Sequence, residues 1–268
     1  MIIWIASYPK SGNTLVRSML AAYFFSKDGV YDFPVIKNIK QFPHGGLFKK
    51  YGINVEDQRE VIKNYINIQK TFCQNNSIQF LKTHSYLFKE FTTLENTLGV
   101  IYIVRDPRNT LLSLTKYLNK PIEEALKYMK LGEGDGLTWT GNWSKNYQSW
   151  KELKNHKKYL LVKYEDLVLH REEVFLNILR FIHNLKKTKL SIDQEKFKNT
   201  IRTTSFEYLK ELENKKGFSE SNIDSSTGKK IPFFDKGPNR DWRNTLDQNY
   251  RKDLEVFFKD KMLELGYL

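Results

Sequence analysis

Several features that would narrow the class of protein are missing from this chain of 268 residues. It has one cysteine, Cys73, so no disulfide can form within the chain, and a metal site built from cysteines is disfavoured. No apolar run reaches the roughly 18 residues that a membrane-spanning helix needs, and the N-terminal residues lack the charged region and cleavage site of a signal peptide. We therefore expect a soluble, cytoplasmic protein.

Acidic residues are fewer than basic ones. The chain has 44 Lys and Arg against 31 Asp and Glu, which gives a formal net charge of +13. Such a charge suits polyanionic partners. No stretch reads as a recognition helix, a zinc finger or an RNA-recognition motif, so nucleic acid is not the partner that we expect. There is no internal repeat or low-complexity block, and the length fits one large α/β domain.

The hydrophobic pattern alternates between strands and helices. Short apolar runs at 2–6, 78–81, 100–104 and 159–162 have the composition of buried parallel strands. Helical patterns occur at 14–25, 108–117, 171–184 and 250–265. This alternation predicts a single-domain, doubly wound parallel sheet flanked by helices, with ligands at the carboxyl ends of the strands. The stretches 28–52 and 214–233 look irregular, and we expect them to be mobile loops.

The first predicted strand leads into a turn that favours anions. The turn reads Tyr8-Pro9-Lys10-Ser11-Gly12-Asn13-Thr14. A helix that follows such a turn presents unpaired backbone N–H groups and a partial positive charge. Gly12 lets the backbone approach an anion closely, and Lys10 adds a full charge. A Walker A loop is excluded, because its Lys follows a second Gly.

Three further segments carry charged or polar side chains. Lys82 and His84 follow the second predicted strand, Arg105 follows the third, and Ser113 comes eight residues after Arg105. Near the C-terminus the chain reads Asp235-Lys236-Gly237-Pro238-Asn239-Arg240-Asp241-Trp242. Because parallel strands end at one edge of a sheet, we expect the residues at the strand ends to share one site.

Taken in order, these segments resemble the motifs of the PAPS-dependent sulfotransferase family of the cytosolic type. The turn is similar to the family's Y-P-K-S-G-T-T-W, and 82–84 to its K-T-H. Arg105 with Ser113 is similar to its Arg–Ser pair, and 235–242 to its R-K-G-x-x-G-D-W. Tyr164-Glu165-Asp166 resembles its Y-E-D, and Thr204-Ser205-Phe206 its T-S-F. The matches run from residue 8 to residue 244.

The resemblance implies a P-loop-like fold and a metal-free reaction. The cosubstrate is 3′-phosphoadenosine 5′-phosphosulfate (PAPS), and 3′,5′-adenosine bisphosphate (PAP) is the product. A sulfuryl group passes to a hydroxyl or amine by in-line displacement, with His84 as general base and Lys10 and Lys82 beside the transferred group. The residues that it implies for cosubstrate binding are Lys10, Ser11, Gly12, Asn13, Thr14, Arg105, Ser113, Tyr164, Ser205, Phe206, Lys236, Gly237 and Arg240.

The chain departs from the family pattern at three positions. Asp235 stands where the family has an Arg, so we expect its carboxylate to point away from the phosphate. Arg240 replaces a Gly, and our hypothesis is that it supplies the missing charge. Leu15 stands where the family stacks a Trp on adenine, and we expect Phe206 to compensate.

Two other classes of function were weighed. A P-loop kinase of small molecules would need a G-K-[ST] pair and an acidic metal ligand at a strand end, and neither occurs. A non-catalytic protein that binds 3′-phosphorylated nucleotides or RNA would not need both Lys10 and His84. The acceptor stays open between a small molecule and a saccharide, and the sequence gives no oligomeric state.

Overall fold

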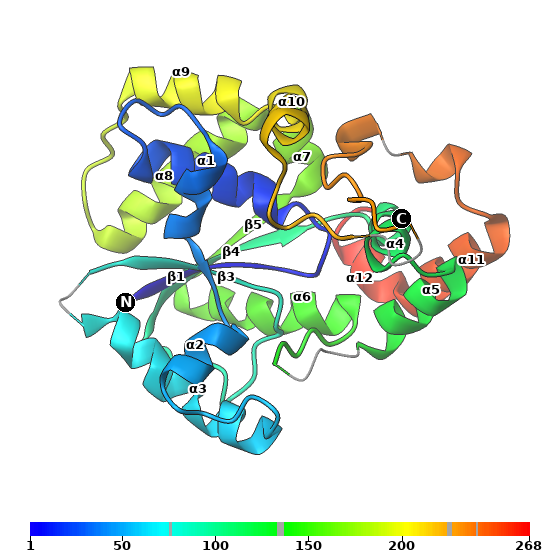
Figure 1. Ribbon diagram of the computed structural model, residues 1–268, viewed down its shortest axis with the longest axis horizontal. Coiled ribbons are helices and arrows are strands. Elements are labelled where there is room, and N and C mark those ends of the chain that lie inside the picture. The colour runs from blue at the N-terminus through cyan, green and yellow to red at the C-terminus, as the bar shows by residue number, and fades with distance from the viewer. Residues whose placement is uncertain (75–76, 133–136, 224–226, 240) are drawn as a thin grey trace.

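The centre of the molecule is a parallel sheet of five strands (Figure 1). The computed structural model describes residues 1–74, 77–132, 137–223, 227–239 and 241–268. The strands are β1 (Ile2–Ser7), β2 (Lys40–Gln41), β3 (Gln79–Thr83), β4 (Thr97–Val104) and β5 (Tyr159–Lys163), in the order β2-β3-β1-β4-β5. All pairs are parallel, which confirms the predicted sheet and four of its strands.

The stretch 28–52 is more regular than expected. It contains the 3₁₀ helix η1 (Phe33–Asn38), strand β2 and helix α2 (Gly45–Lys50). The prediction of an irregular stretch was therefore wrong. β2 pairs with β3 at the edge of the sheet. Because β2 has two residues, it is too short to show a periodic pattern of hydrophobic residues.

Helices cover both faces of the sheet, as a doubly wound fold requires (Figure 1). Every residue of β1 is buried, and its side chains alternate between two cores. Ile3 and Ile5 pack with α1 (Asn13–Phe25) and α8 (Arg171–Lys186), whereas Trp4 and Ala6 pack with α3 (Gln58–Phe72) and α6 (Trp143–Lys151). The described part of the chain contains further helices. These are α4 (Pro107–Leu118), α5 (Ile122–Leu131), α7 (Tyr164–Leu169), α9 (Gln194–Thr203), α10 (Phe206–Lys216), α11 (Gln248–Phe257) and α12 (Lys259–Glu264), with the 3₁₀ helices η3 (Glu152–His156), η4 (Gly237–Asn239) and η5 (Trp242–Asn244).

The helix that we expected at 250–265 is two helices. α11 ends at Phe257 and α12 begins at Lys259, with Phe258 between them at φ −106° and ψ 15°. The ring of Phe258 is buried, with its centroid 5.4 Å from that of Trp143. The interruption accompanies a tertiary contact that the helical pattern alone does not reveal.

The sheet topology defines where a ligand can sit. β1 lies between β3 and β4, so the chain leaves β1 toward one edge and returns to β4 on the other side. A crevice forms at such a switch point, beyond the carboxyl ends of the strands. None of the described helices combines the length and apolar character that crossing a bilayer requires.

Candidate active site

A cavity of about 600 Å³ lies beyond the carboxyl ends of β1, β3, β4 and β5. Its lining includes most of the predicted site residues, namely Lys10, Gly12, Asn13, Thr14, Lys82, His84, Arg105, Ser113, Tyr164, Phe206, Lys236 and Gly237. Two predicted residues do not line it. Ser11 is fully buried, and Ser205 caps α10 by accepting a hydrogen bond from the backbone N–H of Tyr208. Arg240 lies outside the described residues, so its predicted role is neither supported nor opposed.

The turn after β1 has the geometry of an anion cradle. Gly12 has φ +102°, and a Cβ atom there would lie 2.5 Å from Cδ2 of Tyr164, so both the backbone and the neighbouring ring require glycine. Asn13 donates from Nδ2 to the carbonyl of Ile5 at 2.9 Å, which fastens the turn to β1. No side chain caps the N-terminus of α1. The Ser11 hydroxyl is buried outside the cavity lining and has no hydrogen-bond partner among the described residues, so the anion site of the turn depends on its backbone and on Lys10.

His84 is held in the tautomer that a general base needs. Its Nδ1 lies 2.9 Å from the backbone carbonyl of Ser7, and because a carbonyl can only accept, Nδ1 carries the proton. Nε2 is then unprotonated. Burial, followed by the charge of Lys82, lowers the pKa of His84 to about 3, so the ring is neutral at pH 7. Asn146 fixes the backbone here by donating from Nδ2 to the His84 carbonyl at 2.9 Å.

Lys82 meets a carboxylate that the sequence did not predict. Its side chain is almost fully buried, and its Nζ lies 3.7 Å from Oε2 of Glu220. Glu220 also accepts hydrogen bonds from Arg17 Nη1 at 2.6 Å and from the Thr14 hydroxyl at 3.2 Å. It follows α10, in the stretch that we interpreted as a loop. No sequence motif marks it, and only the need of a buried Lys for a counter-charge points to it.

The ammonium group of Lys10 lies between two aromatic rings. Its Nζ is 4.5 Å from the ring centroid of Tyr117 on α4 and 4.1 Å from that of Phe233. Both distances are within the range of cation–π attraction. The backbone of Lys10 has φ +66°, in the left-handed region. The turn therefore directs this Lys across the cavity toward the segment that closes its far side.

Arg105 joins the anion turn to the C-terminal motif. Its Nη1 donates to the carbonyl of Lys10 and its Nη2 to that of Gly237, both at 3.3 Å. Its guanidinium lies 4.2 Å from the ring centroid of Tyr164. The Nε of Arg105 is buried and has no hydrogen-bond partner in the described part of the chain. A buried cation with spare donors is suited to a phosphate.

Asp235 is paired with a lysine on the neighbouring helix. The residue is part of the cavity lining, and its Oδ1 lies 3.0 Å from Nζ of Lys116 on α4. The negative charge is thus balanced by a lysine on the neighbouring helix. This ion pair provides an alternative to the hypothesis that Arg240 alone offsets the change from Arg to Asp.

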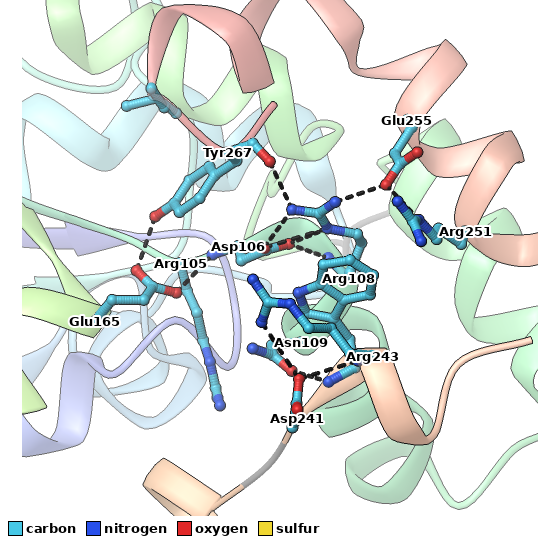
Figure 2. Close-up of polar contacts among 12 residues, drawn as sticks. Arg105, Asp106, Arg108, Asn109, Glu165, Asp241, Arg243, Arg251, Glu255 and Tyr267 are labelled. Carbon is cyan, nitrogen blue, oxygen red and sulfur yellow. Dashed lines mark hydrogen bonds and ion pairs between the residues drawn. The ribbon is translucent and has the colours of Figure 1, made fainter. Parts of the chain in front are cut away.

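Behind Arg105, a polar network fixes the C-terminal segment to α4 (Figure 2). Arg108 pairs with Asp106 at 2.7 Å and with Glu255 at 2.6 Å, and its guanidinium lies 3.8 Å from the ring centroid of Trp242. The backbone N–H of Trp242 donates to Asn109 Oδ1 at 3.0 Å. The Asp-Trp part of the C-terminal motif is therefore an anchor, which holds the preceding residues over the cavity.

The Glu of the Tyr-Glu-Asp segment belongs to the same network (Figure 2). Glu165 accepts from the backbone N–H of Asp106 at 3.0 Å and from the Tyr267 hydroxyl at 2.9 Å. Burial raises the pKa of Glu165, and these donors act in the opposite direction. Glu165 thus ties the start of α4 to the C-terminal end of the chain, while the adjacent Tyr164 faces the cavity.

The cavity lining also contains an arginine that the sequence did not predict as a site residue. Tyr164, Phe206 and Leu15 line the cavity together with Arg171, the first residue of α8. A Cβ atom at Gly237 would lie 2.1 Å from Cε2 of Phe206, so the glycine allows this ring to pack on the C-terminal motif. The position of Arg171 at a helix start gave no signal of a role in the cavity.

Comparison with known proteins identifies the family. The family model described as "Sulfotransferase domain" matches residues 2–266. The chain belongs to the sulfotransferase domain family. Human sulfotransferase 2A1 is 27% identical over 62% of this chain and 57% of its own length. Rat sulfotransferase 1A1 is 27% identical over 93% of this chain and 81% of its own.

The alignments with the first few curated relatives cover less than two thirds of those proteins, for example 57% of human sulfotransferase 2A1 and 60% of human sulfotransferase 1C2. Among solved structures, mouse sulfotransferase SULT7A1 complexed with PAP has a TM-score of 0.61 at 19% identity, over 97% of this chain and 84% of the other. Retinol dehydratase complexed with androsterone and PAP has a TM-score of 0.63 at 17% identity, over 97% and 80%. These likenesses confirm the predicted fold, whereas the roles of individual residues stay predictions.

Proposed function

We propose that this member of the sulfotransferase family transfers the sulfuryl group of PAPS to a hydroxyl or amine of an acceptor. One observation carries the proposal. A single cavity holds a neutral His84 with Lys82 and Lys10 near the ends of β3 and β1, and Arg105 with Gly237 near the end of β4. The first group suits sulfuryl transfer, and the second suits the 3′-phosphate that distinguishes PAPS from other adenine nucleotides.

In this proposal the protein removes a proton and stabilises charge. The unprotonated Nε2 of His84 takes the proton of the attacking hydroxyl as its oxygen bonds to sulfur. PAPS supplies the sulfuryl group, and PAP leaves with the bond electrons. Lys10 and the N-terminus of α1 stabilise the negative charge that develops on the departing oxygen. Lys82 lies where it can neutralise oxygens of the transferred group. Positioning supplies much of the remaining rate enhancement.

The binding residues divide along the length of the cosubstrate. We assign the 5′-phosphosulfate to the turn that contains Ser11, Asn13 and Thr14, and the 3′-phosphate to Arg105 with its partners Ser113, Lys236 and Gly237. We assign the adenosine to Tyr164 and Phe206. Ser205 then acts indirectly, because it caps the helix that begins with Phe206. The Nε of Arg105, which is buried and has no hydrogen-bond partner in the part of the chain that the structure describes, supports this division.

The acceptor that we propose is a small molecule with a hydroxyl on an apolar or ring-shaped body. The cavity lining includes Leu114, Tyr117, Tyr128, Thr138 and Thr140, which combine apolar surface with hydroxyl groups. A guinea-pig relative is named 3-beta-hydroxysteroid sulfotransferase, in line with such an acceptor. A saccharide is the alternative that the hydroxyl groups support. We also propose that the protein works in the cytoplasm.

The proposal is tested by incubating the protein with PAPS and a panel of phenols, sterols, simple alcohols and sugars. Mass spectrometry would detect a product that is heavier by one sulfuryl group, together with PAP. The His84→Ala variant is the matched control. In the same reaction time we expect at least about a hundredfold less sulfated product with His84→Ala than with the unmodified protein. Turnover of ATP by the protein, with PAPS left intact for every acceptor, would contradict the proposal.

A further inference from the structure

We propose that Glu220 is a positioning residue that keeps Lys82 in its ammonium form at the sulfuryl end of the cavity. This inference deepens the proposed function, because it names the group that maintains the charge used there. Glu220 reaches Lys82 from a segment that is remote in the chain and on the opposite side of the cavity.

The contacts of Glu220 define a charge triad. Its Oε1 lies 2.6 Å from Arg17 Nη1, and its Oε2 lies 3.7 Å from Lys82 Nζ and 3.2 Å from the Thr14 hydroxyl. Two cations thus share one carboxylate, which leaves a net charge of about +1 for a group beside the anion turn. The side chain of Glu220 is 28% exposed to solvent, whereas the side chains of Arg17 and Lys82 are 5% and 9% exposed.

A buried Lys in this position requires a counter-charge. The pKa of Lys82 is lowered to about 8, because burial and the charge of Arg17 lower it by more than the charge of Glu220 raises it. Among the described residues, the charged or titratable groups that interact with Lys82 are Glu220, Arg17 and His84. The residues that pair with Lys82 on the adjacent strands, Ile5 and Gln41, are uncharged. Glu220 is therefore the one group in this set that favours the protonated form.

The carboxylate is not needed to hold its own segment in place. Phe218 packs on Phe33 and Phe234, with ring centroids 4.6 and 5.4 Å apart. The Ser221 hydroxyl donates to Glu213 at 2.6 Å, and Asn222 Nδ2 donates to the Tyr117 carbonyl at 2.7 Å. These contacts on either side of Glu220 fasten the segment independently, so the ion pairs of Glu220 have a separate purpose.

Only the protonated form of Lys82 can act in the proposed reaction. As an ammonium ion it can neutralise oxygens of a transferring sulfuryl group, and as a neutral amine it cannot. Burial raises the pKa of Glu220, but Lys82 and Arg17 lower it to about 2, so the carboxylate stays ionised at any pH where the enzyme works. Glu220 thus supplies a constant negative charge, and the ionisation of Lys82 sets the alkaline limit.

The test is a titration of Lys82 in protein that carries ¹³C-labelled lysine, followed by NMR at the Cε carbon. The Lys82→Arg variant identifies the resonance by its loss. In the Glu220→Gln variant we expect the pKa of Lys82 to fall by about one unit or more, the size of effect that a lost opposite charge within a few ångströms has. The titration needs neither PAPS nor an acceptor. A failed transfer assay therefore counts against the proposed function and leaves this inference standing.

Glu211→Gln is the matched control, because Glu211 lies on α10 in the same part of the chain, is exposed, pairs with Lys215 and has no contact with Lys82 among the described residues. It should leave the Lys82 titration unchanged. An unchanged Lys82 pKa in folded Glu220→Gln protein would overturn the inference. An equal shift in Glu211→Gln would also overturn it, because the effect would then not depend on the contact between Glu220 and Lys82.

A kinetic readout separates a charge effect from a structural one. The alkaline limb of the kcat profile should move to lower pH in Glu220→Gln by the same amount as the Lys82 titration. In a Lys82→Arg background the same change should produce no shift, because a guanidinium stays protonated. A shift that persists in that background would contradict the proposal. If Glu220→Gln does not fold, Glu220→Asp shortens the reach to Lys82, and a smaller shift in the same direction is expected.

Discussion

The two sides of the cavity are built by different means. On one side, Lys10 and Arg105 follow the ends of parallel strands and Lys82 lies near the end of β3, so the hydrogen-bonded ladder fixes the backbone up to the site. On the other side, Glu220 and Phe233 come from the chain between 205 and 238, which is fastened by side-chain contacts such as those of Glu213. The strand ends place reacting groups precisely. In the proposed mechanism, the opposite side encloses the cosubstrate, and Glu220 adjusts the charge of Lys82.

This comparison predicts that the largest loss of activity comes from the strand-end side. His84→Ala should lower kcat by about 10²- to 10⁴-fold, because the general base is removed. PAP affinity, measured by calorimetry, should stay close to that of the unmodified protein. If binding and turnover fall together, His84 has a structural role in place of a catalytic one.

Lys10→Ala should have the next largest effect. Loss of its charge beside the departing oxygen should lower kcat by about 10²- to 10³-fold. Steady-state kinetics at saturating PAPS measures this, and circular dichroism checks that the variant is folded. A kcat within a factor of about two of the normal value would remove Lys10 from the chemistry.

A paired substitution compares the two sides of the 3′-phosphate site directly. Arg105 is buried at the end of β4, whereas Lys236 is exposed on the opposite segment. Arg105→Ala should weaken PAP binding by about tenfold to a hundredfold, the range for a lost hydrogen bond to a charged group. Lys236→Ala should weaken it by no more than about fivefold, because solvent screens exposed charges.

Affinity for AMP, which lacks the 3′-phosphate, is the control for both variants and should change little. Equal losses of PAP and AMP affinity in Arg105→Ala would show that the residue supports the fold and does not recognise the 3′-phosphate. A larger loss in Lys236→Ala than in Arg105→Ala would reverse the comparison between the two sides.

The smallest expected effect tests the shape of the turn. In Gly12→Ala the left-handed backbone should cost about 1–2 kcal/mol of stability, and the new methyl group must displace the ring of Tyr164. The melting temperature should fall by several degrees, and the Tyr164→Ala background should recover part of the loss by making room. Full stability in Gly12→Ala would show that the turn is more adaptable than described.

The two sides of the cavity also differ in how far the sequence predicted their residues. The strand-end residues were predictable, because a short apolar run, a turn and a helix are local patterns, and the parallel topology then brings their ends together. Glu220 was not predictable, because its partners Thr14 and Arg17 are more than 200 residues away in the chain. The two residues of β2 were not predicted as a strand, because so short a segment shows no periodic pattern of hydrophobic residues.

The anchoring network shows a further limit of sequence reasoning. Trp242 was recognised through a motif, yet its purpose depends on Arg108 and Asn109 from α4. Such contacts between distant segments are set by the packing of α4 against the C-terminal part of the chain. The family's motifs therefore contain residues of two kinds: some line the cavity, and others, such as Trp242, anchor the segments around it.

The most direct test of the account is calorimetric titration with PAP, AMP and ATP. We predict tight binding of PAP and much weaker binding of AMP and ATP, because we assign the 3′-phosphate, which AMP and ATP lack, to Arg105 and the C-terminal motif. Preference for ATP, or no binding of PAP, would contradict the central claim that this cavity is a PAPS site.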